Sequence, residues 1–126
     1  MAFDENLTLY TAGSAGVTDT ATGDEKDFGS GDLHPITYQM DFPEAGSGAD
    51  TLTATILGGN TSGSVTDVFA SFRTITGSDI VAGQQEFVTA KTPYRYRKAV
   101  LTCSGSGSDF GVVTINPTLG GRYTNY

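Results

Sequence analysis

The chain has 126 residues, of which 37% are hydrophobic and 17 are glycine, and its formal net charge is −7. This length suffices for one core, so we expect residues 1–126 to form a single domain with an N-terminal segment (1–12) and a C-terminal tail (117–126). The low apolar content, the many Thr and Ser residues and the lack of helix-favouring runs exclude a helical bundle and indicate an all-β chain.

Simple features of the sequence exclude further classes of protein. The single cysteine, Cys103, rules out an intramolecular disulfide framework and a cysteine-based zinc cluster. No apolar run approaches the ~18 residues of a membrane-spanning helix. The start MAFDENLTLY lacks the basic and apolar regions of a signal peptide, so we expect synthesis in a reducing cytoplasm.

Apolar and polar residues alternate in short stretches that are separated by Gly, Ser and Pro. In chain order we expect strands at residues 7–12, 17–22, 36–42, 52–56, 65–75, 85–90, 94–104 and 110–116. Within the fifth stretch we expect one side to carry Val68, Ala70 and Phe72, and the other side to carry Phe69, Ser71 and Arg73. About eight short antiparallel strands predict a β-sandwich of jelly-roll type with mobile termini, and an immunoglobulin-like sandwich is the second possibility.

The charge is unevenly placed along the chain. Residues 1–50 carry ten acidic residues and one basic residue, whereas residues 51–126 carry four acidic and six basic residues. Four of the seven basic residues fall within KTPYRYRKA, residues 91–99. A phosphate backbone needs a broad positive surface, so the overall charge disfavours nucleic acid as a partner.

The basic stretch has two main interpretations. On a strand, one face would carry Tyr94, Tyr96 and Lys98, and the other face Arg95, Arg97 and Ala99. The stretch is then either an edge strand whose charges prevent pairing with other chains, or a protein interface, because Tyr and Arg are enriched at binding hot spots. Stacking of nucleic-acid bases on the tyrosines is a weaker third possibility.

No arrangement of residues indicates catalysis or metal binding. The only histidine, His34, precedes Pro35 and has no serine in a nucleophile motif to serve. Asp24, Glu25 and Asp27 are close in sequence but lack the spacing of a calcium loop. We therefore expect no enzymatic activity, no cofactor and no metal.

Three pieces of the chain resemble the small capsid cement, or decoration, proteins of tailed phages. They are the opening MAFDENLTLY, the stretch KTPYRYRKAVLTCSG, and FGVVTI followed by a short tail. The chain departs from the family pattern at Arg97 and Lys98, where large apolar residues would be expected to alternate more regularly.

The resemblance implies a catalytically inert jelly roll on the outer capsid surface of a virion, made in the host cytoplasm. It would bridge neighbouring copies of the major capsid protein as a homodimer or homotrimer, without contacting nucleic acid or membrane. The candidate interface residues are Phe3, Leu7, Leu9, Tyr10, Tyr94, Arg95, Tyr96, Arg97, Lys98, Arg122 and Tyr123. The alternative function is a carbohydrate- or receptor-binding sandwich of a virion tail or fibre, with a groove at Tyr94 and Tyr96.

Overall fold

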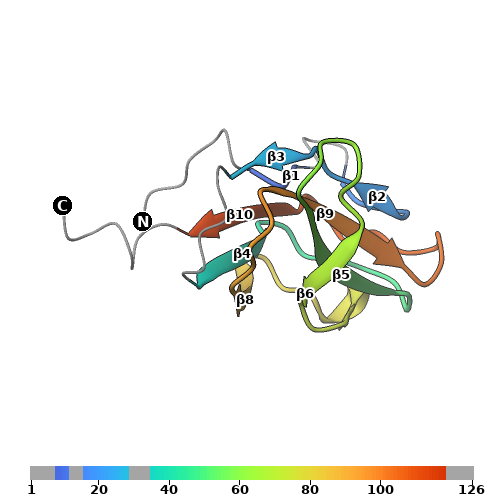
Figure 1. Ribbon diagram of the computed structural model, residues 1–126. Helices are drawn as coiled ribbons and strands as arrows, with labels where there is room; N and C mark the ends of the chain where they lie inside the picture. The colour runs from blue at the N-terminus through green and yellow to red at the C-terminus, as the bar shows by residue number, and fades with distance from the viewer. Residues whose placement is uncertain (1–7, 12–15, 29–34, 119–126) are drawn as a thin grey trace.

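The computed structural model describes residues 8–11, 16–28 and 35–118, and these form two antiparallel β-sheets that pack face to face (Figure 1). Sheet A has the strand order β1-β10-β4-β8. Its members are β1 (Tyr10–Thr11), β10 (Thr114–Thr118), β4 (Ile36–Phe42) and β8 (Gln84–Ala90).

Sheet B has the order β2-β9-β5-β6, with β3 also pairing β9 and β7 also pairing β5. Its members are β2 (Ala21–Thr22), β3 (Lys26–Asp27), β5 (Thr51–Gly59), β6 (Asp67–Ser71), β7 (Ile75–Thr76) and β9 (Tyr96–Cys103). The only helical turn among the described residues is the 3₁₀ segment Gly77–Asp79. The expected all-β antiparallel sandwich is confirmed.

The described residues form ten strands rather than the eight expected. The excess comes from two interrupted strands, because β2 and β3 lie in turn against β9, while β6 and β7 lie in turn against β5. When β2 and β3 are counted as one strand and β6 and β7 as another, the described strands number eight. Renumbered along the chain, they have the order 1-8-3-6 in sheet A and 2-7-4-5 in sheet B.

The core lies between the sheets and follows the alternation of the sequence. In β5 the buried residues Leu52, Ala54 and Ile56 alternate with half-buried threonines, as expected for a strand with one face on the core. In β4 the core side carries Ile36, Tyr38, Met40 and Phe42, all of them buried. This pattern fixes the register, because a shift of one residue would expose the whole apolar set.

A β-bulge changes the expected orientation of β6. The register against β5 shifts between Ile56 and Leu57, so that Leu57 pairs with Val68 and Ile56 pairs with Ala70. Phe69 is therefore the extra residue, and it packs against the core while Val68 is 60% exposed. The prediction that Val68 shares the inward side with Ala70 is wrong for this reason.

Two other expectations need correction. The basic stretch enters β9, which is not an edge strand: it pairs with β5 over eight residues and with β2 and β3 on its other side. The C-terminal tail does not begin at residue 117, because β10 continues to Thr118 and pairs there with Thr37 of β4. Within the described ranges, no helix is long and apolar enough to span a membrane.

The two ends of the sandwich differ in charge. The acidic end consists of loops 16–20, 43–50, 77–83 and 104–113, which contain no Lys or Arg. Its acidic residues are Asp19, Glu44, Asp50, Asp79 and Asp109. Backbone hydrogen bonds join these loops, including Ser47 N to Asp109 O (2.7 Å) and Gly46 N to Ile80 O (3.1 Å).

The mixed-charge end consists of β3, the turn at residues 60–66 and residues 91–98. It contains most of the basic residues that the structure describes. They are Lys26, Lys91, Arg95, Arg97 and Lys98.

Candidate functional site

The exposed side chains of the basic stretch are tied to acidic neighbours of the same chain. Arg95 donates from Nε and Nη2 to the two carboxylate oxygens of Asp27, both at 2.8 Å. The hydroxyl of Tyr94 donates to Asp67 Oδ2 at 2.6 Å. An isolated exposed ion pair of this kind adds little to stability, but it reduces the net positive charge of this surface.

Glu25 adds a further acidic group at this end. Its carboxylate accepts hydrogen bonds from the Ser62 hydroxyl (2.6 Å) and the Gly63 N–H (2.9 Å). These bonds, Ser62 first, hold the pKa of Glu25 below its usual range, and the nearby charge of Lys98 acts in the same direction. The mixed-charge end therefore combines both signs of charge within one set of loops.

Arg97 is buried rather than presented at the surface, with 2% of its area exposed. Its Nη1 donates to the Tyr38 hydroxyl at 2.7 Å, and its Nε donates to the Tyr94 carbonyl at 3.1 Å. The guanidinium lies over the Phe28 ring at 4.4 Å and near the Phe69 ring at 5.9 Å, both within cation–π range. No carboxylate of the described residues forms an ion pair with it.

The structure separates the candidate interface residues into three groups. Leu9 and Arg97 are buried, so their side chains contribute to the core and not to a contact surface, which corrects the prediction for these two. The residues that reach the surface at least in part are Tyr10, Tyr94, Arg95, Tyr96 and Lys98. The residues outside the described ranges are Phe3, Leu7, Arg122 and Tyr123, together with the isolated histidine His34.

A second surface, which the sequence did not single out, lies on the outer face of sheet A. Three side chains each from β10, β4 and β8 form three rows across the strands. We call this surface the sheet-A grid; its rows are Thr118–Thr37–Thr89, Asn116–Gln39–Phe87 and Thr114–Asp41–Gln85. Asp41 is its only charged residue, and Phe87 is 54% exposed.

Hydrogen bonds fix several side chains of the grid. The hydroxyls of Thr37 and Thr89 are 2.7 Å apart, and the Gln39 amide donates to Asp41 Oδ1 at 2.6 Å. Gln39 is only 5% exposed although it points away from the core. The grid is thus a preorganised polar surface beside an exposed aromatic ring.

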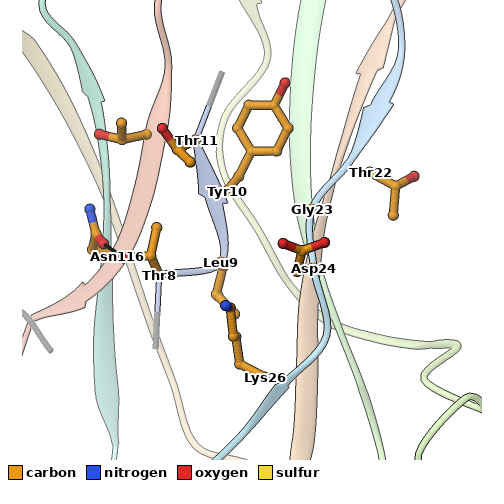
Figure 2. Close-up of a pocket in the computed structure, with 10 residues that line it drawn as sticks. Thr8, Leu9, Tyr10, Thr11, Thr22, Gly23, Asp24, Lys26 and Asn116 are labelled. Carbon is orange, nitrogen blue, oxygen red and sulfur yellow. Dashed lines mark hydrogen bonds between the residues drawn. The ribbon is translucent and has the colours of Figure 1, made fainter. Parts of the chain in front are cut away.

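Two depressions border the grid. The larger, of about 780 Å³, lies between β1 and the β2–β3 segment and includes Thr114 and Asn116 of the grid. Figure 2 shows Thr8, Thr11 and Asn116 on one side of β1, and Asp24 on the segment between β2 and β3. The smaller, of about 320 Å³, includes Asp41, Gln85 and Thr114. Neither depression is lined by Tyr94 or Tyr96.

Close backbone packing forms part of the larger depression. The Gly23 N–H donates to the Ala99 carbonyl at 2.8 Å, which fixes the β2–β3 segment on sheet B. A side chain at Gly23 would collide with the carbonyl oxygen of Leu9, so only glycine allows the two segments to approach this closely. Nearby, the Thr8 hydroxyl donates to Asn116 Oδ1 at 2.7 Å.

The described residues contain no group of three or more His, Cys, Asp and Glu side chains that could hold a metal ion. Cys103 is half-buried on β9 and packs against the core. Burial, and then the charges of Asp19 and Asp50, raise the pKa of its thiol, so this position disfavours the reactive thiolate.

Comparison of the chain with models of known protein families, and with curated protein sequences, finds no match.

Proposed function

We propose that this protein is a capsid cement protein, which binds the outside of an icosahedral phage shell and bridges neighbouring major capsid proteins. Its task is mechanical, because a rigid sandwich that contacts two capsid subunits makes their separation costlier. Weak individual contacts suffice, since many copies act together across the lattice. From the strand orders 1-8-3-6 and 2-7-4-5 we infer that the sandwich is of jelly-roll type, and this inferred fold supports the proposal.

The separation of charge between the two ends is the observation that carries the proposal. The four loops of the acidic end hold five acidic residues and no basic residue, whereas the mixed-charge end holds Lys91, Arg95 and Lys98 near its surface. A protein with this asymmetry meets a surface in a preferred orientation, because complementary charge steers the encounter. The acidic end then faces solvent and repels stray DNA and other virions.

The test is co-sedimentation with empty shells of the phage that encodes the chain, after removal of the resident cement protein. The triple variant Lys91→Ala/Arg95→Ala/Lys98→Ala should reduce occupancy at least tenfold at equal protein concentration. Added salt should weaken binding of the unchanged protein, because exposed charges are screened. Arg97 is left unchanged because its burial would confuse binding with folding.

The matched control is the double variant Glu44→Gln/Asp79→Asn, which alters exposed residues of the acidic end and should keep full occupancy. If the unchanged protein does not sediment with shells, the proposed function is wrong. If the triple variant occupies shells fully, the basic residues of the mixed-charge end do not contribute to shell binding. Light scattering of the pure protein tests the expected dimer or trimer.

A further inference from the structure

We propose that the sheet-A grid and its two depressions form a binding site for a neutral oligosaccharide. Lys91, Arg95 and Lys98 of the mixed-charge end do not line either depression of this site, and its function does not depend on binding to a shell. It also differs in location from the groove at Tyr94 and Tyr96 that the sequence suggested.

The chemistry of the grid matches that of a sugar. Seven of its nine side chains are polar and at least partly exposed, and together their hydroxyl, amide and carboxylate groups can both donate to and accept from sugar hydroxyls. The bonds between Thr37 and Thr89 and between Gln39 and Asp41 hold these groups in place before a ligand arrives. A preorganised site loses less conformational entropy on binding.

Phe87 supplies the apolar part of the site. Its ring is 54% exposed and lies directly opposite Gln39 in the central row of the grid. The C–H face of a sugar ring is apolar and can stack on an aromatic ring while its hydroxyls reach the neighbouring polar groups. An exposed phenylalanine that is flanked by amides therefore favours a ligand with one apolar face and many hydroxyls.

The depressions give the site its depth. The larger one, about 780 Å³, is within the usual size range of small-molecule sites, and the smaller one measures about 320 Å³. Both contain Thr114, so they adjoin the same row of the grid. The larger one also contains Tyr10, Asp24 and Lys26, which would contact a ligand that extends past β1 (Figure 2).

Size and charge argue for this class of ligand. Strand and residue spacings give the grid an extent of roughly 10 by 14 Å, far below the roughly 800 Å² per partner of a stable protein interface. Asp41 and Asp24 contribute negative charge at the site, and among the described residues that line the two depressions only Lys26 is basic. An anionic glycan would meet this charge and the net charge of −7, so a neutral one is favoured.

The experiment is an array of neutral oligosaccharides built from glucose, galactose, mannose and N-acetylhexosamines, with sialylated and sulfated oligosaccharides as a second set. We expect the protein to retain members of the neutral set. Phe87→Ala and Asn116→Ala should each weaken the strongest interaction at least tenfold. Val68→Ala, which removes another exposed apolar side chain on the opposite sheet, should leave it unchanged.

Titration of the best oligosaccharide into labelled protein, followed by NMR, gives a readout that does not need a variant. Amide signals of Gln39, Thr114 and Asn116 should shift more than those of Thr53 and Thr102 on sheet B. The inference is wrong if no neutral oligosaccharide is retained, if only anionic ones are, or if both variants bind like the unchanged protein. Phe87→Ala should keep full shell occupancy, so this result is distinguishable from failure of the cement proposal.

Discussion

The contact between Arg97 and Tyr38 allows a direct test of the energetics of the fold. Tyr38→Phe removes one hydroxyl group, which accepts the 2.7 Å bond from Arg97 Nη1, and keeps the ring that packs edge-on against Phe69. Both Tyr38 and Arg97 are buried, so water cannot replace the lost partner of the guanidinium. A hydrogen bond to a charged group contributes about 1.5–3 kcal/mol, so we expect the free energy of unfolding to fall by about 2 kcal/mol.

Urea unfolding monitored by circular dichroism measures this loss, provided that the dependence of the free energy on urea stays constant. Arg97→Met should also destabilise the protein, because it leaves the Tyr38 hydroxyl without its donor. The double variant should lose at least about 1 kcal/mol less than the sum of the two single variants. Tyr94→Phe is the control, since its hydroxyl bonds Asp67 in an exposed position, and it should have a smaller effect. A loss below about 0.5 kcal/mol for Tyr38→Phe, or simple additivity, would refute this reasoning.

Three further predictions concern pH and close packing. Burial raises the pKa of Tyr38 above its ordinary value of 10.0, despite the opposing charge of Arg97. As pH rises above that value, the Tyr38 hydroxyl loses its proton first in the unfolded chain, so the free energy of unfolding should fall. Unfolding free energies from about pH 8 to about pH 11 should show a shallower decline for Tyr38→Phe, and equal slopes would contradict the assignment. The hydrogen bond from Arg73 lowers the pKa of Glu86 from its ordinary value of 4.5. Ionised Glu86 therefore stabilises the fold above pH 4.5, and this contribution disappears as pH falls through the lowered pKa. Glu86→Gln should make the free energy of unfolding depend less steeply on pH at acid pH, whereas the control Glu44→Gln should have no comparable effect. An unchanged pH dependence for Glu86→Gln would contradict a stabilising Arg73–Glu86 ion pair. Gly58→Ala should destabilise the fold by about 1–3 kcal/mol in thermal unfolding, because the new methyl group collides with the Tyr94 ring. Gly107→Ala is the control, since its methyl group makes only ordinary contact with Asp50 and should leave stability nearly unchanged. Equal melting temperatures of these two variants would show that Tyr94 moves aside easily.

The fold class was predictable because the alternation in the central strands is strong. Residues 36–42 and 51–59 show apolar side chains at every second position, and the structure places these residues in β4 and β5. The bulge at Phe69 was not predictable, since the local sequence fits either orientation of Val68 and Phe69. Only the register against β5 decides between them, and that register depends on residues about a dozen positions away.

The basic stretch shows why contact surfaces are harder to predict than strands. Its alternation placed Arg95, Arg97 and Ala99 on one face; Arg97 and Ala99 are buried there, whereas Arg95 precedes β9 and is exposed. A charged residue on the core side contradicts the usual pattern, and only the spatial proximity of Phe28, Phe69 and Tyr38 makes it tolerable. The sheet-A grid was missed for the opposite reason, because its members come from three separate strands and none of them stands out in its own segment.

The contrast between the loops determines where foreign sequence can be inserted. At the acidic end, Gly46 and Gly77 pack so closely on backbone atoms of neighbouring loops that an added peptide would disrupt several connections at once. The turn at residues 60–64 is exposed; the Ser62 hydroxyl and the Gly63 N–H donate to Glu25, and Asn60 Oδ1 accepts from the Arg95 N–H. An epitope or reporter peptide grafted into this turn should leave the sandwich intact, but because the turn belongs to the mixed-charge end, the insertion should lower shell occupancy.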